Sequence, residues 1–432
     1  MMLLMLARYG LSGLWQASDF MKYIILIGDG MADNPIHERQ GRTPLELADI
    51  PNMDKLANRG TTGLAMTVPK GLEPGSDTAI LSIFGYNPEE FFSGRSPLEA
   101  AGLGIDLNPG DFSFRCNMVS LDDAGDFSKK KILSHSGGSV DGSDALALMD
   151  ALTDNGTFGQ LAQENGIEFY KTPSFRHIAV QRNYRRSLDS DFCTFPPHEY
   201  ISREIGEFLP HGESGRARGL RGLMGLSYGI LDGHPINQER RTKGRLPANC
   251  IWFWAEGSAA KLPRFAPGGL VVTAVPLVRG IARLIGLEVA EVAGATGDIS
   301  TNYEGKAAAV LKGLSGGLDF AALHVEAPDE CTHNGDLEGK IKSIESIDKR
   351  CLGPLLDGLS DLGEEFRILI LSDHKTLIST RGHDAGAVPY ILYDSREQKC
   401  SGRPYSEREC EKGGLVGDGT QLIDRLLENT MD

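Results

Sequence analysis

Three short apolar runs, each ending in an acidic residue, constrain the fold of this chain more than any other feature. The runs end at Asp29 in "YIILIGD", at Asp329 in "DFAALHVEAPD" and at Asp373 in "FRILILSD". Continuous apolar runs of this length between helical segments are typical of strands in a parallel sheet that is covered on both faces. Because the working site of an open α/β sheet lies beyond the carboxyl ends of its strands, we expect the three carboxylates to converge on one edge.

Helical patterns alternate with these strands. They occupy "NMDKLANRG", closed by Gly60, "NYEGKAAAVLKGL" from Asn302, and "LEGKIKSIESIDKRCLGPLLDGL" from Leu337. We expect Pro354 to break the last of these helices, because proline removes a helical hydrogen bond. "VPYILY" from Val388 predicts a further strand, and "GTQLIDRLLEN" predicts a C-terminal helix. This alternation at both ends of the chain predicts an α/β fold.

The middle of the chain differs from its two ends. At 432 residues the chain exceeds the roughly 250 to 300 residues at which single hydrophobic cores stop growing, so two domains are expected. Between residues 106 and 292 the acidic strand ends disappear, and irregular, Gly-rich stretches such as "SHSGGSVDGSD" replace them. We therefore predict an inserted domain at 106–292, within a core formed by 21–105 and 293–432.

The first twenty residues do not continue this pattern. In residues 1–20 a short apolar run precedes the only arginine, the reverse of the order in a signal peptide, and the run is too short to span a membrane. A strand pattern begins at once after Met21. We therefore expect translation to begin at Met21, with 1–20 a non-native start or a disordered extension; a weak membrane anchor is the alternative.

The charge and the cysteines exclude several classes of protein. A formal charge of -15 and a pI of about 5.2 argue against a nucleic-acid or anionic-membrane surface, so an anionic substrate must be met by a local cluster of cations. Seven cysteines without a Cys-x-x-Cys pair indicate reduced thiols in a cytoplasmic protein, and neither a disulfide framework nor a thiolate zinc site.

Ser76, in "LEPGSDTAILSIFGY", has two interpretations. It follows a Pro-Gly turn and precedes a helical pattern that places Ile80, Leu81 and Phe84 on one face, so it stands where a helix cap is expected. The N-terminus of a helix also favours an anion, and a phosphate bound there would lie against the Ser76 hydroxyl. The two roles are compatible, and we expect both.

The segments after the acidic strand ends contain the pattern of a metal site. "APDECTHNGD" places Asp329 and His333 four residues apart, so one helical turn can present both to the same ion. "SDHKTLISTRGHDAGAVP" adds further carboxylate and imidazole groups. The set contains seven oxygen and nitrogen ligands, enough for two ions and without a thiolate: Asp29, Ser76, Asp329, His333, Asp373, His374 and His383.

Each of these residues also has a structural alternative. An aspartate after a strand is commonly a turn former, and a lone histidine is commonly a surface or core residue. Their joint occurrence at the carboxyl ends of predicted strands favours the metal site. Metal coordination can activate a serine hydroxyl, and two ions can stabilise the attacking and leaving oxygens at phosphorus. The pattern therefore indicates phosphoryl transfer through a phosphoserine at Ser76.

The sequence also resembles a known family. The segments that carry the resemblance are "MKYIILIGDGMADNPI", "GRTPLELADIPNMDKLANRG", "EPGSDTAILSIFGYNP", "GRSPLEAAGLGIDL", "FRCN", "TNYEGKA", "APDECTHNGD" and "LSDHKTLISTRGHDAGAVP". Together they are similar to the archaeal-type cofactor-independent (2,3-bisphosphoglycerate-independent) phosphoglycerate mutases of the alkaline phosphatase superfamily. The similarity runs from about Met21 to the C-terminus and is most specific in the two terminal thirds.

The resemblance implies an alkaline-phosphatase-like core, with a mostly parallel central sheet flanked by helices, and an inserted α+β domain. It implies that Ser76 is transiently phosphorylated and that no bisphosphoglycerate is required. It assigns one divalent ion to Asp29, Ser76, Asp373 and His374, and the other to Asp329, His333 and His383. The ligand set suits manganese, magnesium or zinc.

The inserted domain is then expected to hold the glycerate. Arg115 in "FRCN" and Arg176 with His177 in "SFRHIAV" are candidates, because arginine can bind carboxylate and phosphate bidentately. Lys306 is a further candidate, and a surface ion pair is the alternative for each. The basic stretches at 129–131 and 240–245 are expected to be solvated loops. The candidates for the general acid or base are His135, His177 and His198.

These inferences predict an isomerase that interconverts 3-phosphoglycerate and 2-phosphoglycerate, with a small phosphorylated metabolite as its partner and no nucleic acid or membrane. Three departures from the family pattern leave a second possibility open: the insert is divergent, Lys375 stands where the family usually has proline, and several segments resemble a subgroup proposed to be homoserine kinases. That alternative is a homoserine kinase-like phosphotransferase or a phosphatase. A non-catalytic relic is disfavoured because it would be expected to have lost ligands.

Overall fold

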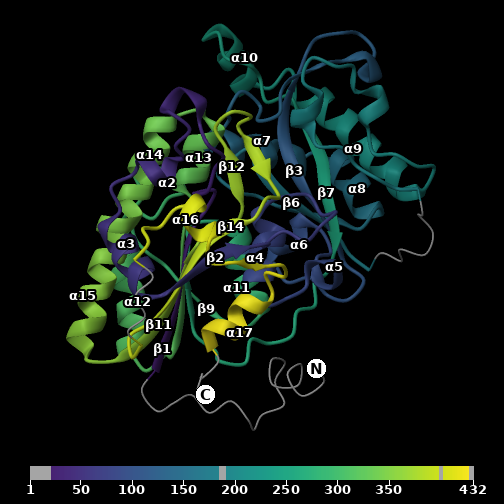
Figure 1. The fold of residues 1–432 in the computed structure, drawn as a ribbon. Helices are drawn as coiled ribbons and strands as arrows, with labels where there is room; N and C mark the ends of the chain where they lie inside the picture. The colour runs from purple at the N-terminus through teal and green to yellow at the C-terminus, as the bar shows by residue number, and fades with distance from the viewer. Residues whose placement is uncertain (1–20, 184–190, 398–401, 428–432) are drawn as a thin grey trace. The chain divides into compact units, whose positions relative to one another are not determined.

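The computed structural model describes residues 21–183, 191–397 and 402–427 (Figure 1). The expectations for residues 1–20 lie outside this range. The described residues form two compact units. The first unit comprises residues up to Phe92, Ala101–Leu103 and everything from Lys261 onward, and the second comprises Ser93–Ala100 and Gly104–Ala260.

The first unit is built on an eight-stranded sheet with the order β15-β2-β14-β11-β1-β10-β8-β9. The pairs β1–β10, β1–β11, β8–β10, β8–β9 and β2–β15 are parallel, whereas β14 is antiparallel to both β11 and β2. The predicted α/β fold with a mostly parallel sheet is therefore confirmed. The strands are β1 (Met21–Gly28), β2 (Thr61–Ala65), β8 (Leu270–Val272), β9 (Glu288–Ala290), β10 (Phe320–Val325), β11 (Glu365–Leu371), β14 (Val388–Asp394) and β15 (Leu415–Val416).

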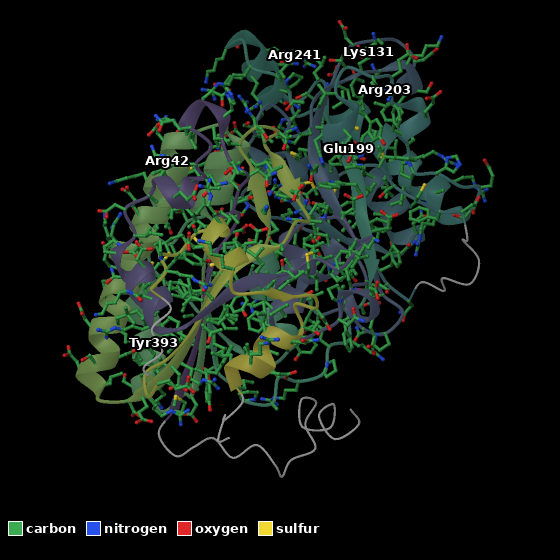
Figure 2. All side chains as sticks on the ribbon, in the orientation of Figure 1. Arg42, Lys131, Glu199, Arg203, Arg241 and Tyr393 are labelled. Atoms are coloured by element: carbon green, nitrogen blue, oxygen red, sulfur yellow. The ribbon has the colours of Figure 1, made fainter. Side chains whose placement is uncertain are left out.

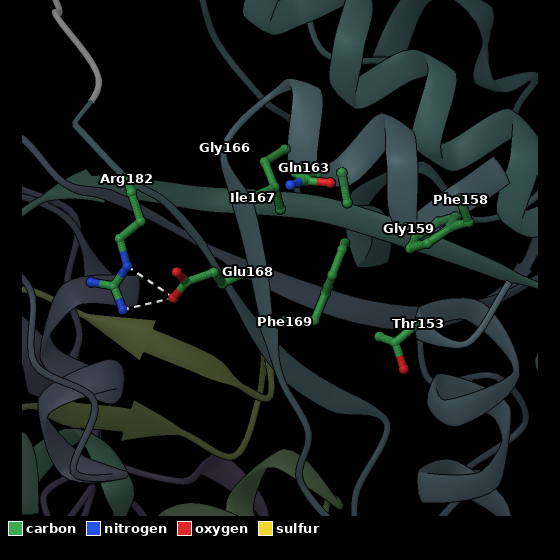
Figure 3. A pocket seen from close by; sticks show the side chains of 10 residues that line it. Thr153, Phe158, Gly159, Gln163, Gly166, Ile167, Glu168, Phe169 and Arg182 are labelled. Carbon is green, nitrogen blue, oxygen red and sulfur yellow. Dashed lines mark hydrogen bonds and ion pairs between the residues drawn. The ribbon is translucent and has the colours of Figure 1, made fainter. Parts of the chain in front are cut away.

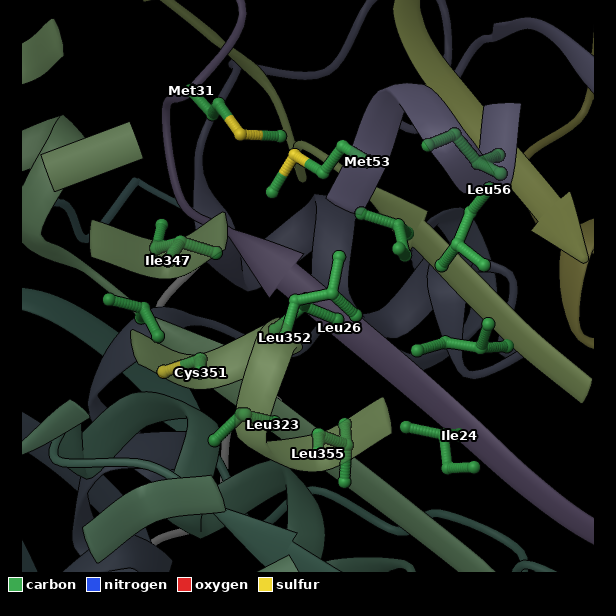
Figure 4. Packing of buried hydrophobic residues seen from close by; sticks show 14 of the residues in the cluster. Ile24, Leu26, Met31, Met53, Leu56, Leu323, Ile347, Cys351, Leu352 and Leu355 are labelled. Carbon is green, nitrogen blue, oxygen red and sulfur yellow. The ribbon is translucent and has the colours of Figure 1, made fainter. Parts of the chain in front are cut away.

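Alternate residues of the central strands pack on opposite faces of this sheet. Ile24 and Leu26 of β1 and Leu323 of β10 join a core cluster with side chains such as Met53 and Leu355 from the covering helices (Figure 4). The longer α-helices that contribute to this cluster are α3 (Pro51–Arg59), α12 (Tyr303–Ser315), α14 (Leu337–Ser346) and α15 (Gly353–Leu362).

On the face of the sheet opposite to Leu323, β10 packs against aromatic side chains. The Phe320 ring lies 6.2 Å from the Phe84 ring and 4.8 Å from the Phe265 ring, measured between centroids. Phe84 directly follows helix α4 (Ser76–Ile83), which contacts α11 (Pro276–Leu284) and α17 (Gln421–Leu427). His324 has the same parity along β10 as Phe320, so it points to this face of the sheet.

The expected break at Pro354 does not occur. The chain passes from α14 through a π-helical segment, η6 (Ile347–Leu352), directly into α15. Pro354 stands at the beginning of α15, where the wider π turn leaves no need for its missing N–H. The prediction was wrong because a π segment lets a helix continue through a proline.

The second unit has its own sheet, in which β3 pairs with β4, β6 and β7, and β6 pairs with β5. All of these pairs are antiparallel, and a separate core cluster joins the sheet to helices. Its strands are β3 (Phe112–Leu121), β4 (Ile132–Ser134), β5 (Ile167–Tyr170), β6 (Arg176–Gln181) and β7 (Cys250–Ser258). Its longer helices are α7 (Gly142–Thr153), α8 (Gly156–Glu164), α9 (Gly215–Leu231) and α10 (Pro235–Thr242).

Shorter elements complete the described residues. In the first unit they are η1 (His37–Arg39), α2 (Pro44–Leu47), α5 (Pro88–Phe91), α13 (Ala327–His333), α16 (Glu407–Glu411) and the hairpin of β12 (Lys375–Leu377) and β13 (Gly382–Asp384). In the second unit they are η2 (Phe127–Lys129), η4 (Pro197–Tyr200) and η5 (Ile205–Phe208), while α6 (Arg95–Gly102) belongs in part to each unit.

The second unit ends earlier than the predicted insert. Strand β8 pairs with β10 and β9 pairs with β8, so residues from Lys261 to 292 belong to the first unit and not to a domain that ends at 292. Each of these strands has only three residues, and β8 is followed by Thr273 and not by an acidic residue, so neither strand shows the long apolar run that predicts a core strand.

The basic stretches are not simply solvated loops. Lys129, Lys131 and Arg241 are exposed, and the last two lie at the surface in Figure 2, but Lys130 and Arg240 are buried. The Lys130 ammonium lies 4.1 Å from the centre of the Tyr228 ring, and Arg240 donates to the carbonyls of Gly137, Gly138 and Leu246. Lys130 and Arg240 therefore contribute to the packing of the second unit.

The structure also bears on membrane-spanning helices and on the state of the cysteines. Within the described residues, none of the helices has the length and apolar character that crossing a bilayer requires. The six described cysteines are all unpaired thiols: Cys116, Cys193, Cys250, Cys331, Cys351 and Cys410.

Candidate active site

The acidic strand ends of the first unit converge as expected. Asp29 follows β1 directly and Asp373 follows β11 by two residues, and these strands are neighbours in the sheet. Asp329 lies in the short helix α13, which follows β10 on the other side of β1. Because β10, β1 and β11 are parallel, their carboxyl ends share one edge.

The first group of predicted ligands, here named the Asp29 cluster, contains Asp29, Ser76, Asp373 and His374. The Ser76 Oγ lies 3.3 Å from Asp29 Oδ2 and 3.3 Å from His374 Nε2. The same His374 Nε2 lies 3.6 Å from Asp29 Oδ1 and 3.4 Å from Asp373 Oδ2. The two carboxylates and the imidazole are buried, and the Ser76 residue is partly exposed.

The second group, the Asp329 cluster, contains Asp329, His333 and His383. His333 Nε2 lies 3.1 Å from Asp329 Oδ2 and 3.0 Å from His383 Nε2, and His383 Nε2 lies 3.4 Å from Asp329 Oδ1. One turn of α13 presents Asp329 and His333 together, and the hairpin strand β13 adds His383. His374 lies between the clusters, because its ring centre is 4.1 Å from that of His383.

Ser76 is the first residue of α4, and its side chain makes no capping hydrogen bond. Gly75 occupies the cap position with an extended backbone. The predicted role of Ser76 as a side-chain cap is therefore wrong, because its hydroxyl instead faces Asp29 and His374. The hydroxyl remains available for chemistry at the N-terminus of an eight-residue helix, where an anion is favoured.

Thr376, which the sequence did not indicate, connects the two clusters. Its hydroxyl donates to Asp329 Oδ1 over 2.6 Å and lies 3.2 Å from His374 Nδ1. The Lys375 carbonyl is also 3.3 Å from His374 Nδ1. Since the hydroxyl proton goes to a carboxylate and a carbonyl only accepts, Nδ1 must carry the imidazole hydrogen. The lone pair on His374 Nε2 therefore faces Ser76.

A buried lysine holds the backbone that carries Thr376. The Lys340 ammonium, fully buried on α14, donates to Asp33 Oδ2 over 2.8 Å and to the Thr376 carbonyl over 2.6 Å. The backbone N–H of Ile378 donates to the same Asp33 oxygen. This buried pair fixes the backbone of β12 and, with it, the Thr376 hydroxyl that contacts both clusters.

The clusters contain more negative charge than their histidines balance. Burial, together with the neighbouring Asp373 and Asp329 carboxylates, raises the pKa of Asp29 well above its usual range. Burial would also raise the pKa of Asp329, but its hydrogen bonds to His333 and His383 outweigh burial and hold it well below its usual range. The hydrogen bond to Asp329 raises the pKa of His333 to about 9.

The donor atoms fit divalent cations. Asp29 Oδ1 and Asp373 Oδ2 are buried and have no hydrogen-bond partner among the described residues. The ligand atoms of Asp329, His374 and His383 lie within 4.8 Å of one another, as do those of Asp29, His324 and Asp373. Buried carboxylate oxygens without partners are costly unless a cation satisfies them, so these residues fit metal ions.

The predicted residues of the insert lie among other partners in the second unit. The Arg115 guanidinium is buried, and it forms a paired contact with the Glu99 carboxylate, with 2.7 Å between its Nε and Oε2. It also lies 4.7 Å from the centre of the Trp254 ring. Arg176 is exposed and stacks 5.0 Å from the Phe175 ring centre.

The remaining histidine candidates differ in burial. His177 is completely buried on β6; its Nδ1 accepts from the Thr172 N–H, and its Nε2 has no hydrogen-bond partner among the described residues. His198 is exposed, and its ring lies 5.3 Å from that of Trp254 and 6.1 Å from that of the half-buried His135. Partial burial lowers the pKa of His135, and desolvation of the part of the ring that faces Trp254, together with nearby cationic groups, lowers the pKa of His198.

Lys306, the candidate from the first unit, is also buried. Its ammonium donates to the His324 carbonyl over 3.2 Å. Burial lowers the pKa of this lysine. In the structure Lys306 therefore contacts the strand that carries His324 and not an open surface.

A cavity of about 400 Å³ lies elsewhere in the second unit (Figure 3). Apolar side chains such as Phe158, Ile167 and Phe169 line it, and Arg182 is paired with Glu168 at 2.9 Å. None of the predicted site residues lines this cavity.

The fold and the site thus define an α/β protein with a serine beside two carboxylate–imidazole clusters. Residues 57–237 match the family model described as 2,3-bisphosphoglycerate-independent phosphoglycerate mutase. A relative named 2,3-bisphosphoglycerate-independent phosphoglycerate mutase, from Methanosarcina acetivorans, is 41% identical over 414 residues, which cover 94% of this chain and 100% of that protein.

Solved structures agree with this relationship. A Pyrococcus horikoshii protein has a TM-score of 0.75 and 28% identity, covering 96% of this chain and 99% of that one. The cofactor-independent phosphoglycerate mutase from Thermoplasma acidophilum has a TM-score of 0.58 and 25% identity, covering 94% and 99%. The chain belongs to the 2,3-bisphosphoglycerate-independent phosphoglycerate mutase family.

Proposed function

We propose that this protein is an isomerase that interconverts 3-phosphoglycerate and 2-phosphoglycerate through a phosphoserine at Ser76, without added bisphosphoglycerate. The observation that supports it most is the Ser76 hydroxyl, which makes no capping bond and lies 3.3 Å from each of two acceptors, Asp29 Oδ2 and His374 Nε2. The full-length similarity to mutases favours this activity over the homoserine kinase-like and phosphatase alternatives.

The neighbours of Ser76 prepare it for attack. A serine hydroxyl has one proton, which Asp29 Oδ2 can accept, whereas the lone pair of His374 Nε2 serves the ion proposed below. The Ser76 oxygen then forms a bond to phosphorus while the bond from phosphorus to O3 of the glycerate breaks, and O3 takes up a proton. In the second step O2 attacks the phosphoserine, loses its proton, and Ser76 leaves with its hydroxyl restored.

We propose that two divalent ions, manganese, magnesium or zinc, are held by the same residues. Asp29, Ser76, Asp373 and His374 would hold one ion, and Asp329, His333 and His383 the other. Bound there, the ions would stabilise negative charge on the phosphate and on the attacking and leaving oxygens. The unpartnered Asp29 Oδ1 and Asp373 Oδ2 support this assignment because they offer free lone pairs.

The residues that bind the glycerate portion remain a proposal. Arg176 suits it best because its guanidinium is exposed, whereas Arg115 is paired with Glu99, and His177 and Lys306 are buried. The acid or base would be His135, His177 or His198. The substrate must be held while phosphate is on Ser76, and water must be excluded, since water would otherwise hydrolyse the phosphoserine. A cytoplasmic location is consistent with this metabolite and with unpaired cysteines.

The test is a coupled assay of protein that has been stripped of metal and reloaded with Mn²⁺, without bisphosphoglycerate. The Ser76→Ala variant is expected to lose at least about 10³-fold in kcat, since it removes the nucleophile. Ser82→Ala, on the same helix with a buried hydroxyl that makes no hydrogen bond within the described residues, is the matched control and is expected to remain within about threefold.

Two results would overturn the proposal. If Ser76→Ala retains more than a tenth of the activity, Ser76 is not the nucleophile. If the wild-type protein binds Mn²⁺ but does not convert 3-phosphoglycerate, the proposed mutase activity is wrong, although the proposed metal site is supported. In acid-quenched samples of the wild type, a phosphate should be found on the peptide that contains Ser76. In samples of Ser76→Ala, the peptide that contains Ser82 should carry no phosphate.

A further inference from the structure

His324 is a buried histidine that belongs neither to the predicted ligand set nor to the groups that take part in the proposed reaction. It lies on β10, and 1% of its surface is exposed. Its Nε2 is 3.1 Å from Asp29 Oδ2, and its Nδ1 is 3.2 Å from the Thr273 hydroxyl. A histidine in the interior of a strand, held at both ring nitrogens and in contact with a carboxylate of the site, needs an explanation beyond packing.

The partners of His324 fix its hydrogen-bond direction. The carboxylate of Asp29, in its ionised form, can only accept, so the hydrogen between these residues belongs to His324 Nε2. A neutral imidazole with its hydrogen on Nε2 has a lone pair on Nδ1, which must accept from Thr273. The Thr273 oxygen itself accepts from the Val275 N–H over 3.1 Å, so its own proton is free to go to His324.

The chain of hydrogen bonds runs from Thr273 to His324 to Asp29 Oδ2. Asp29 Oδ2 also receives the contact from Ser76, whereas Asp29 Oδ1 is left without a hydrogen-bond partner among the described residues. By donating to Oδ2, His324 orients the Asp29 carboxylate so that Oδ1 is the oxygen without a hydrogen bond. The backbone beneath it is held as well, because Lys306 donates to the His324 carbonyl.

We propose that His324 is a positioning residue that orients the Asp29 carboxylate and reserves Oδ1 for a divalent cation, with Thr273 fixing the tautomer of His324. The inference rests on the proposed metal site. Hydrogen bonds from residues behind the ligands orient them and raise the affinity for the metal, and their loss typically costs about 10- to 100-fold in affinity.

A second reading of the same atoms makes His324 itself a ligand, since its nitrogen lies within 4.8 Å of oxygens of Asp29 and Asp373. The hydrogen-bond direction disfavours this reading, because a nitrogen that carries a hydrogen has no lone pair for a metal ion. The positioning role and the ligand role of His324 predict different results for a His324→Gln substitution. The amide of glutamine can donate to Asp29 from the position of Nε2, but it is a poor nitrogen ligand.

The experiment titrates the metal-free full-length protein with Mn²⁺ and follows free Mn²⁺ by electron paramagnetic resonance. For His324→Leu we expect one of the two bound ions to be held about 10- to 100-fold more weakly, with kcat reduced and KM little changed. For His324→Gln we expect an affinity within about threefold of the wild type. Thr273→Val should weaken the same ion severalfold, while Thr62→Val, in a buried position of the same sheet, should not.

Other outcomes contradict the proposal in distinct ways. If His324→Gln weakens Mn²⁺ binding as much as His324→Leu, His324 is a ligand and not a positioning residue. If His324→Leu folds, as judged by circular dichroism, and binds both ions normally, His324 has neither role. Asp29→Asn tests the premise separately: if this variant binds both ions with wild-type affinity, the proposed metal site itself is wrong.

Discussion

Gly30 is the residue at which the backbone comes closest to the site. Its φ is +60°, its N–H donates to Asp373 Oδ1, and a Cβ at this position would overlap Thr376 Oγ1 and lie 2.7 Å from Asp329 Oδ1. We expect Gly30→Ala to displace the Thr376 hydroxyl and Asp329 together. Binding of Mn²⁺ should weaken at least about tenfold, and the free energy of unfolding should fall by about 2 to 4 kcal/mol in urea titrations.

Gly41 provides the control for this substitution. It has a φ of +70°, but no atom lies within 4 Å of the position that a Cβ would occupy there. Gly41→Ala therefore carries only the cost of a left-handed backbone, about 1 to 2 kcal/mol, and should leave Mn²⁺ binding unchanged. Equal effects of the two substitutions on metal affinity would show that the close approach at Gly30 is unimportant.

Glu99 and Arg115 form a buried ion pair in the second unit that makes stability depend on pH. Burial alone would raise the pKa of Glu99, but the Arg115 guanidinium outweighs it and holds this pKa at about 2, against an ordinary value near 4.5. Because the pKa is lower in the folded state, the pair stabilises the protein above about pH 4.5, and this contribution is lost as the pH falls from 4.5 toward 2. The shift corresponds to at most about 3 kcal/mol.

The measurement is the free energy of unfolding of the wild type and of Glu99→Gln between pH 7 and pH 3. The wild type should lose more stability than the variant over this range, because only the wild type has this carboxylate to protonate. At pH 7 the variant should be less stable by about 3 to 5 kcal/mol, since Arg115 is left buried without its partner. Parallel curves for the two proteins would contradict the assignment.

At the scale of the elements, helix α3 has a cap that comes from another helix. Its own cap residue, Ile50, makes no side-chain hydrogen bond. The buried Asp348 of the π segment instead accepts from the backbone N–H groups of Asn52 and Met53, at 3.2 and 2.7 Å. We expect Asp348→Ala to lower the free energy of unfolding by about 2 to 3 kcal/mol, because these N–H groups then lose their partner.

Urea titrations of Asp348→Ala and of Asp357→Ala make the comparison. Asp357 is an exposed aspartate of α15, and its removal should change the stability by less than about 0.5 kcal/mol. Asp348→Asn should lie between these extremes, since its amide oxygen can still accept. If Asp348→Ala is as stable as the control, the cap does not contribute to stability.

The strand ends explain how much of the site could be predicted from the sequence. Asp29, Asp329 and Asp373 each follow an apolar run, and the spacing of Asp329 and His333 matches one helical turn, so local pattern sufficed. The structure brings these residues together with Ser76, His374 and His383. Their roles toward individual ions remain a proposal.

The residues that the sequence did not indicate act across long sequence separations. His324 lies within an apolar strand, where the pattern is that of a core residue, while Thr376 and Thr273 are ordinary threonines until the fold places them beside Asp329 and His324. Strands β8 and β9 were missed because three residues give too little periodicity to recognise. Tertiary contact, and not local pattern, determines these features.

At the scale of the whole molecule, the two units contain separate hydrophobic cores, and all the predicted metal ligands lie in the first. Trp252 and Trp254 lie in the second unit, and Trp15 lies outside the described residues. In a Trp15→Phe protein, tryptophan fluorescence therefore reports on the second unit, whereas circular dichroism reports on both.

We expect removal of the metal to lower the stability of the first unit selectively, because its buried carboxylates then repel one another without compensation. Adding Mn²⁺ at about 100 times its dissociation constant should contribute about 2.7 kcal/mol for each site that is filled, and each such site should raise the circular dichroism midpoint by about 5 to 10 °C. The fluorescence midpoint should shift by less than about 2 °C, because the core around Trp252 contains no ligand. Equal shifts of the two signals would mean that the units unfold as one, since a cation can stabilise the second unit only through its coupling to the first.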